Sequence, residues 1–132
     1  MIFRFKPYFN NCELKIIQSN IIVCYLFSAP TVSIRGGGGQ GEVGITHEGV
    51  KGSICSTYWS KDDAVVLCKS KGYKDGGVLP SPRPVEGKIF LSKMRCDGKE
   101  NSIFRCNNSG WDVYKSFTCG GYAAVMCYKN SE

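Results

Sequence analysis

Eight cysteines are the residues of this 132-residue chain whose number and spacing most directly indicate chemistry. Thiolates either bind a metal or join as disulfides. A zinc site needs short paired spacings such as C-x2-C, because a tight turn must direct two thiolates at one ion. The closest cysteines, Cys119 and Cys127, are eight positions apart, and the single histidine, His47, belongs to no ligand motif. The pattern favours a disulfide framework formed in an oxidising compartment over a metal centre.

Residues suited to catalysis are sparse. With one histidine and no G-x-S-x-G sequence, the chain offers no Ser-His-Asp set. A glycine run at 36–39 lacks the G-K-[ST] and the following helix of a phosphate loop, so it indicates a turn. Asp62 and Asp63 could act as catalytic carboxylates or metal ligands, but their place at a helix start favours a structural role. The sequence predicts a non-enzymatic chain with no metal and no cofactor.

The charge balance is mildly basic, with 17 Lys and Arg against 11 Asp and Glu and a formal net charge of +6. Such an excess permits attraction to acidic surfaces, glycans or nucleic acid, and an ordinary solvated basic surface is the simpler alternative. No run of basic residues is interleaved with aromatics. We therefore predict no specific nucleic-acid recognition.

One helix is clearly indicated, at about residues 60–71. Ser60 and Asp63 have the spacing of a capping box, and Asp62 adds a second acid to the first turn. Gly72 provides a stop signal at the other end. The residues expected on one face of this helix are Ala64, Leu67, Cys68 and Lys71.

Short strands make up the rest of the predicted core. In one of them Val43 and Ile45 alternate with smaller residues and are expected on one face. Residues 76–87 carry three prolines and are predicted to form a long loop. One helix among several short strands indicates an α+β, mostly β domain. The strands are expected at 31–35, 42–46, 52–55, 89–91, 103–106 and 123–128.

The first 30 residues differ in texture from residues 31–132, which we predict to form the folded domain. Residues 21–29 are apolar, too short to span a bilayer as a helix but long enough for a signal-peptide core. The expected small-residue cleavage pattern is poor. An atypical signal peptide and an irregular extension or fragment edge both remain open. Cys12 and Cys24 lie in this stretch, outside any defined framework.

Residues 31–132 carry a series of motifs in a fixed order. Lys51–Cys55 echo W-G-T-V-C, with lysine in place of tryptophan, and Trp59–Gly72 echo W-D-x-N-D-A-x-V-V-C-R-Q-L-G without a gap. Ile89–Cys106 follow I-W-L-D-x-V-R-C-x-G-x-E-x-x-L-x-x-C. This part of the chain resembles the scavenger receptor cysteine-rich family. Further echoes are Val32–Gly37, Gly41–Ile45, Gly110-Trp111 and Ala123–Cys127.

The resemblance implies a curved antiparallel sheet cradling one helix and stapled by three disulfides. Sequence alone allows 15 pairings of six cysteines. The family pattern implies Cys55–Cys119, Cys68–Cys127 and Cys96–Cys106. Members with eight framework cysteines have a further pair, for which this chain has Gly39 or a neighbour at one position and Tyr73 at the other. The resemblance therefore indicates the six-cysteine class.

The family also implies a function. Its members recognise proteins or polyanions outside the cell, often in innate immunity, as secreted proteins or as ectodomains of membrane receptors. The sequence is thus expected to be an extracellular ligand-binding module. The alternatives are a non-catalytic accessory module of a larger modular enzyme, of the lysyl-oxidase-like or serine protease kind, and a non-functional fragment.

One departure from the family concerns calcium. Members that bind it place two aspartates after the first framework cysteine and a glutamate between the last two, because calcium prefers several hard oxygen ligands. Here Ser56 and Thr57 follow Cys55, and no acid lies between Cys119 and Cys127. We predict that this cation site is absent.

Ligand contact is then expected to depend on basic side chains and on loop residues. The loop between Cys106 and Cys119 is longer than usual in the family; Asn107-Asn108-Ser109 within it is an N-glycosylation acceptor sequence. Lys93 stands where the family often has an aspartate. The aromatic and basic residues of this loop are Trp111, Tyr114, Lys115 and Phe117. The candidate ligand-binding residues are Arg83, Lys88, Lys93, Arg95, Lys99 and Arg105.

Overall fold

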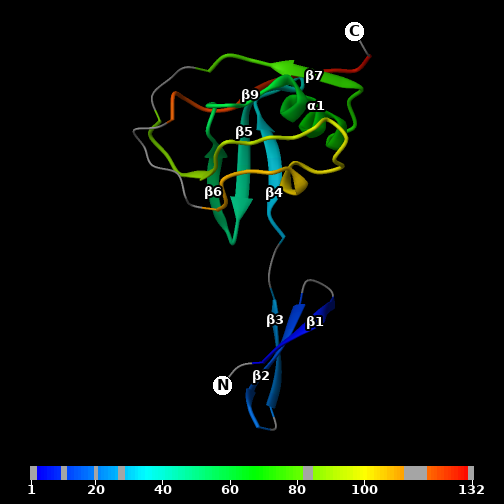
Figure 1. Ribbon diagram of the computed structural model, residues 1–132, viewed down its shortest axis with the longest axis vertical. Helices are drawn as coiled ribbons and strands as arrows, with labels where there is room; N and C mark the ends of the chain where they lie inside the picture. The colour runs from blue at the N-terminus through cyan, green and yellow to red at the C-terminus, as the bar shows by residue number, and fades with distance from the viewer. Residues whose placement is uncertain are drawn as a thin grey trace. The chain divides into compact units, whose positions relative to one another are not determined.

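The computed structural model describes residues 3–9, 12–19, 21–26, 29–81, 85–111 and 119–130 (Figure 1). The chain divides into two compact units. The first comprises Met1–Thr31 with Thr46–Val50, and the second comprises Val32–Ile45 with Lys51–Glu132. In the described residues, no helix is long and apolar enough to cross a membrane.

The first unit contains a three-stranded sheet in the order β1-β2-β3. Strands β1 (Phe3–Phe9), β2 (Cys12–Gln18) and β3 (Ile21–Leu26) pair antiparallel with their sequence neighbours. Runs of β-branched residues such as those in β3 suit strands. The irregular conformation that we considered for this stretch is therefore wrong for the described residues, while its role as a signal peptide stays a prediction.

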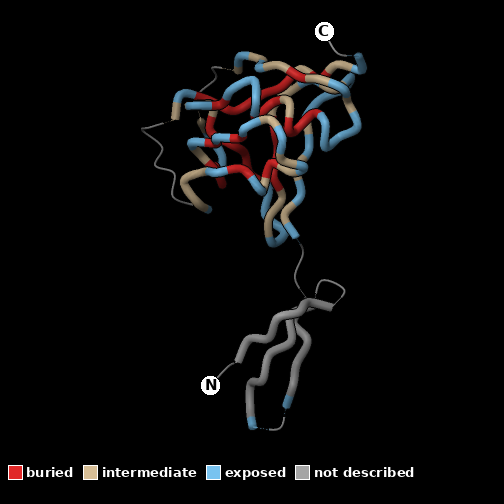
Figure 2. Tube along the Cα trace, turned by 45° about the vertical axis from the view of Figure 1, so that its right-hand side comes forward, coloured by how far each residue is buried: buried red, intermediate tan, exposed pale blue. Residues whose placement is uncertain are grey.

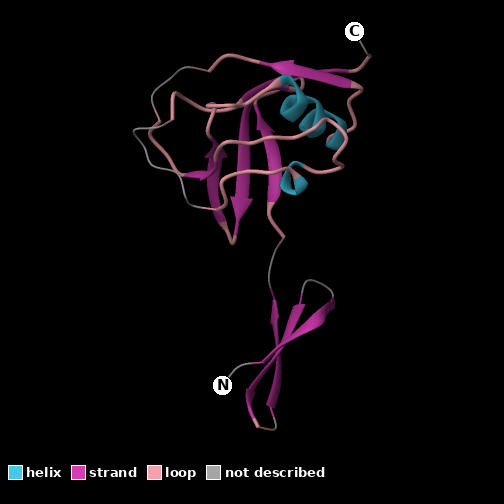
Figure 3. Cartoon of the chain, viewed as in Figure 1, coloured by secondary structure: helices cyan, strands magenta, loops and turns pink. Residues whose placement is uncertain are grey.

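The second unit is built on a sheet in the order β7-β9-β5-β6-β8, with β4 paired to β5. The pairs β5–β9 and β7–β9 are antiparallel, whereas β6–β8 is parallel. Figure 3 shows the sheet with its connecting loops. The strands are β4 (Thr31–Arg35), β5 (Gln40–His47), β6 (Val50–Ile54), β7 (Asp75–Val78), β8 (Ile89–Leu91) and β9 (Ala124–Tyr128).

Helix α1 (Lys61–Ser70) lies against β7 and β9, within one residue of its predicted bounds at each end. The predicted capping box is present, and the Ser60 N–H donates to the Asp63 carboxylate at 2.8 Å. Ala64, Leu67 and Cys68 are buried as expected. Lys71, expected on the same face, follows the last helical residue and is exposed. The fold is the predicted mostly β class with one α-helix in the described residues.

The core of the second unit gathers buried residues from α1, from the sheet and from the segment 94–106, and Figure 2 shows the buried residues in red. Val43 and Ile45 of β5 are both buried, as their alternation predicts. The core also includes the fully buried Ile54, Leu67, Leu91, Ile103 and Val125.

Two predicted elements need correction. Ile103–Arg105 forms a short 3-10 helix, η1, instead of a strand, and the Ser102 hydroxyl caps it by accepting from the Phe104 N–H. Residues 76–78, expected in a loop, belong to strand β7. Glycine is required there because a Cβ on Gly76 would lie 2.5 Å from the Cys68 sulfur. Of the predicted loop, residues 82–84 lie outside the described residues.

Three disulfides tie the second unit together. Cys55 bonds to Cys119, Cys68 to Cys127 and Cys96 to Cys106, with sequence separations of 64, 59 and 10 residues. These are the pairs that the family resemblance implies. Two of them join the middle of the chain to residues 119 and 127, of which Cys127 is in β9, and the third closes a short loop.

Tyr73 and Gly39 lie side by side; the family resemblance implies that Tyr73 and Gly39 or a neighbour stand where eight-cysteine members have a further cysteine pair. A Cβ on Gly39 would lie 2.6 Å from the Tyr73 hydroxyl oxygen. Gly39 also has a positive φ of 76°, which glycine adopts at little cost. The aromatic ring thus packs directly on the glycine backbone.

Candidate functional site

The candidate site is built on two chain segments, residues 92–96 and 106–109, that the Cys96–Cys106 disulfide joins. The Arg95 N–H donates to the Asn107 carbonyl at 2.8 Å, which makes an isolated antiparallel bridge. The Ser109 N–H donates to the Ser92 carbonyl at 3.0 Å, and the two serine hydroxyls lie 2.6 Å apart. The disulfide and these hydrogen bonds fix the two segments against each other.

Asp63 at the start of α1 anchors the first of these segments. Its Oδ1 accepts from the Cys96 N–H at 2.7 Å, next to Arg95, and its side chain is fully buried. Burial raises the pKa of the Asp63 carboxyl, against the opposing effect of the hydrogen bonds from Cys96 and Ser60. A buried acceptor with several donors is an expensive group to remove. The helix cap therefore helps to position the site.

A hollow of about 390 Å³ opens beside these segments. We call it the basic hollow, and it is lined by Tyr58, Lys93, Arg95, Asn108 and Ser109. Lys93 and Arg95 are exposed, whereas Met94 between them is 1% exposed and belongs to the core. This alternation places both cations at the surface while the residue between them holds the segment in place.

Tyr58 and Lys93 both have left-handed backbone conformations, with φ of 70° and 52°. Such conformations are uncommon outside glycine, and they occur often at functional sites. The Tyr58 side chain is 67% exposed. Both residues also line a smaller neighbouring hollow of about 240 Å³, with Cys55, Thr57 and Ser92. Tyr58 and Lys93 therefore line both hollows.

The electrostatics of the basic hollow favour anions. In the part of the chain that the structure describes, no acidic side chain forms an ion pair with Lys93 or Arg95. The guanidinium group offers five N–H donors in a plane, which suits carboxylate, sulfate and phosphate groups. The hollow can thus bind an anionic group between a lysine, an arginine and an exposed aromatic ring.

The structure does not bring Lys88, Lys99 or Arg105 to this hollow. Lys88 lies with its Nζ 5.5 Å from the centre of the Phe90 ring and lines a separate hollow of about 260 Å³ that also includes Arg35 and Lys51. Lys99 and Arg105 are exposed on the loop and the η1 turn between Cys96 and Cys106. Arg83 lies outside the described residues.

Tyr58, Asn108 and Ser109 line the basic hollow but were not predicted as ligand residues. Tertiary contacts bring them there, and the sequence carries no periodic signal for such contacts. Lys51 was noted as a replacement for the family tryptophan, yet its proximity to Lys88 depends on the β6–β8 pairing. Arg35 belongs to the Val32–Gly37 motif, which carries no indication of ligand contact.

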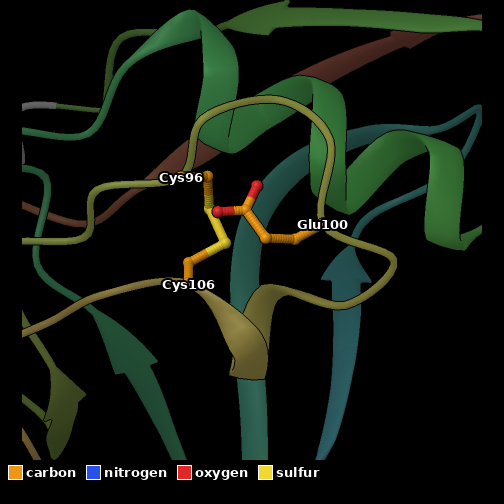
Figure 4. A group of neighbouring side chains, drawn as sticks. All are labelled: Cys96, Glu100 and Cys106. Carbon is orange, nitrogen blue, oxygen red and sulfur yellow. A yellow bond between two sulfur atoms is a disulfide. The ribbon is translucent and has the colours of Figure 1, made fainter.

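Cys96, Glu100 and Cys106 form a group with metal-ligand side chains (Figure 4). The two cysteines are bonded to each other, so neither is a thiolate that could bind an ion. The Glu100 carboxylate accepts from the N–H groups of Asp97 and Gly98 at 3.0–3.2 Å. The group is a disulfide beside a carboxylate that organises its own loop.

At the positions where calcium-binding members of the family have acidic ligands, this chain has the hydroxyl residues Ser56 and Thr57 and, between Cys119 and Cys127, no acidic residue. The Ser56 N–H donates to the Gly121 carbonyl at 3.0 Å, and the Gly120 N–H donates to the Thr57 hydroxyl at 3.3 Å. Hydroxyls without carboxylates make a poor calcium site. The absence of calcium binding stays a prediction.

Of the four aromatic and basic residues singled out in the loop between Cys106 and Cys119, the structure describes Trp111, whereas Tyr114, Lys115 and Phe117 lie outside the described residues. Its ring packs edge-on to Phe90, with centroids 5.7 Å apart, and stacks on Phe104 at 6.0 Å. The side chain is 38% exposed. Trp111 therefore packs against two core-side rings and still presents part of its side chain at the surface.

Comparison with known proteins identifies the family. The family model of the scavenger receptor cysteine-rich domain matches residues 36–128. Macrophage receptor MARCO of Mus musculus is 35% identical over 80 residues, which is 61% of this chain and 15% of that protein. A scavenger receptor cysteine-rich domain superfamily protein of Patiria pectinifera is 38% identical over 101 residues, 73% of this chain and 9% of that protein. The chain thus spans a small part of these relatives.

Solved structures agree. The SRCR domain of mouse MARCO, crystallised in a dimeric form, superposes with a TM-score of 0.61 at 32% identity, covering 73% of this chain and 93% of that one. The third SRCR domain of murine neurotrypsin has a TM-score of 0.62 at 22% identity, covers 79% of this chain and 100% of that one, and shows the fold alone. The chain belongs to the scavenger receptor cysteine-rich domain family.

Proposed function

We propose that this chain is an extracellular ligand-binding module that recognises polyanions through the basic hollow, without catalysis. The observation that carries the proposal is the pairing of Lys93 and Arg95 at one depression, both exposed and both without an acidic partner among the described residues. Acidic patches on proteins are polyanions too, and they are included among the proposed ligands.

The family membership supports this proposal. Among the relatives are receptors, including macrophage scavenger receptor types I and II of Bos taurus, at 39% identity over 89 residues. Disulfides such as these persist in oxidising compartments, which agrees with an extracellular location. The chemistry at the site is that of charge and hydrogen bonding, with no nucleophile or general base needed.

Binding to heparin tests the proposal, with the double variant Lys93→Ala and Arg95→Ala. Two exposed charge contacts contribute on the order of 1–2 kcal/mol together, so we expect roughly a tenfold loss of affinity. Affinity of the unaltered chain is expected to fall as salt rises from about 50 to 300 mM.

The matched control is Lys69→Ala with Lys74→Ala, which removes the same charge from exposed positions that do not line the hollow. We expect this control to retain most of the affinity. Equal losses for the two double variants, or binding that is insensitive to salt, would show that the hollow is not the site.

The chain also fits a second role, as an accessory module within a longer protein. Lysyl oxidase homolog 2 of Xenopus tropicalis is 36% identical over 78 residues, which is 10% of that protein. The module would then supply binding beside a separate catalytic domain. A full-length transcript that encodes a catalytic domain in the same chain would support this second role.

A further inference from the structure

Asn107 lies directly opposite Arg95 in the isolated antiparallel bridge. Residues in that relation project their side chains to the same face, with Cβ atoms about 4.5–5.5 Å apart. Arg95 lines the basic hollow, and Asn107 is exposed. The Asn107 side chain therefore leaves the surface at the rim of the hollow.

The same asparagine begins the acceptor sequence Asn107-Asn108-Ser109, whose second and third residues also line the hollow. We propose that Asn107 carries an N-linked glycan and that this glycan covers the basic hollow, so that glycosylation controls access of polyanions to Lys93 and Arg95. This inference depends on the proposed function, because the hollow is the site that the glycan closes.

The modification is an ordinary glycosyl transfer from a lipid-linked diphospho-oligosaccharide. A bond forms between the Asn107 amide nitrogen and the anomeric carbon of the first sugar, and the bond from that carbon to the diphosphate breaks. The lipid diphosphate leaves with the electron pair, and a base on the transferase takes the amide proton.

The folded structure indicates when this transfer takes place. In the fold, the Ser109 hydroxyl donates to the Ser92 carbonyl at 3.0 Å and lies 2.6 Å from the Ser92 hydroxyl. The acceptor hydroxyl is thus engaged once segments 92–96 and 106–109 have joined. Transfer precedes that step, and the Arg95–Asn107 bridge then fixes the attached sugar beside Arg95.

An attached glycan is bulky and strongly hydrated. With its first sugar tethered across from Arg95, it occupies the space through which an extended anion reaches the hollow. The cations themselves are unchanged, so the effect is on access and not on charge.

The test uses the full chain produced in a eukaryotic secretory host, compared with Asn107→Gln from the same host. Intact mass is expected to show one glycan that is lost in the Asn107→Gln variant. Heparin affinity is expected to be at least tenfold higher for Asn107→Gln. Trimming the glycan to its first sugar with an endoglycosidase is expected to restore part of the affinity; trimming leaves residue 107 uncharged, unlike hydrolysis of the whole glycan to aspartate.

A relocated glycan provides the control. Lys69→Asn with Lys71→Thr, in the Asn107→Gln background, creates an acceptor sequence at exposed positions at the end of α1. Its heparin affinity is expected to be the same before and after trimming. Equal affinity of the glycosylated chain and Asn107→Gln, or an Asn107 that carries no glycan, would overturn this inference alone. Absence of heparin binding in every form would overturn the proposed function as well.

Discussion

Asp63 links the helix to the candidate site through one carboxylate. One oxygen accepts from Ser60 at the helix start, and the other accepts from the Cys96 N–H at 2.7 Å, in a fully buried position. The sequence predicted the first contact, because the capping box is local. The second joins residues 33 positions apart, and nothing in the local pattern indicates it.

The titration of Asp63 gives a prediction for stability against pH. Burial raises its pKa in the folded chain above the ordinary value of 3.8, so the folded state holds this proton more tightly than the unfolded chain. The stabilising contribution is fully present below the unfolded pKa and is lost as pH rises through the folded pKa. Urea unfolding of the disulfide-intact chain and of Asp63→Asn should therefore show the wild type gaining relative stability as pH falls from 7 towards 4.

Asp97 supplies a control of opposite sign. The Lys99 N–H bonds to its carboxylate at 2.7 Å and, together with Glu100, lowers its pKa. Its contribution is present above the unfolded pKa and is lost as pH falls through the folded pKa. The profile of Asp97→Asn relative to wild type should slope the other way. Parallel profiles for the two variants would refute the assignment to Asp63.

Calcium binding is a second prediction at the scale of residues. With Ser56 and Thr57 in place of aspartates, we expect millimolar calcium to change the melting temperature by less than about 1 °C, because hydroxyl oxygens are weak calcium ligands. Chelator should have equally little effect. A rise of several degrees in differential scanning fluorimetry would contradict this, with magnesium as the control for ionic strength.

At the scale of elements, the predicted bounds agree with the structure where the residues that determine an element lie within it or next to it. The predicted bounds of α1 are within one residue of the observed ones because its signals, the Ser60 cap, the apolar spacing and Gly72, all lie in the helix or within two residues of its ends. Strand β7 was missed because Gly76 and Gly77 resemble a turn, and its need for glycine comes from Cys68 on another element. The run Ile103-Phe104 favours a strand by type, but the Ser102 cap selects a 3-10 turn.

The contact between Gly39 and Tyr73 can be tested by a single methyl group. Gly39→Ala places a Cβ 2.6 Å from the tyrosine oxygen and strains a φ of 76°, so we expect a loss of about 2–3 kcal/mol in the free energy of unfolding. Gly38→Ala is the matched control, because its φ is 73° and nothing lies within 4 Å of the added carbon. It should cost about 1 kcal/mol.

A double-variant cycle separates the steric contact from the backbone strain. In a Tyr73→Ala background, Gly39→Ala should cost no more than Gly38→Ala, because the clashing ring is gone. Additive losses would mean that Tyr73 does not fill this space.

At the scale of the whole molecule, the disulfides differ in what they hold. Replacing Cys68 and Cys127 by alanine opens a separation of 59 residues, and replacing Cys96 and Cys106 opens one of 10. The chain-entropy model gives losses of about 4 and about 3 kcal/mol, respectively. Denaturant unfolding of the two double variants is expected to follow that order.

Ligand binding should respond in the reverse order. The Cys96–Cys106 bond joins the segments that carry Arg95, Asn108 and Ser109, so its removal is expected to weaken heparin binding in molecules that remain folded. Removal of Cys68–Cys127 should leave the affinity of the folded fraction close to that of wild type. Equal affinities for the two variants would show that the short loop does not organise the site.

The sequence predicted the two cations of the basic hollow but not the residues around them. Lys93 and Arg95 could be proposed from charge and from their place in the family motif. The presence of Tyr58 and Ser109 beside them could not be predicted, because it depends on the turn after Cys55 and on the Ser92–Ser109 contact. Sequence patterns report which residues face outward, whereas a depression is defined by segments that meet only in the fold.

The order of the cysteines along the chain also limits the order in which the disulfides can form during synthesis. As the chain leaves the ribosome N-terminus first, Cys96 and Cys106 can join early, but Cys55 and Cys68 must wait for Cys119 and Cys127. Asn107 emerges 20 residues before Cys127. At about 5–20 residues per second, these 20 residues take roughly one to four seconds to synthesise, and the Cys68–Cys127 disulfide can form only after that interval. On the proposed secretory route, the last two disulfides therefore close after the acceptor sequence at Asn107 has already emerged.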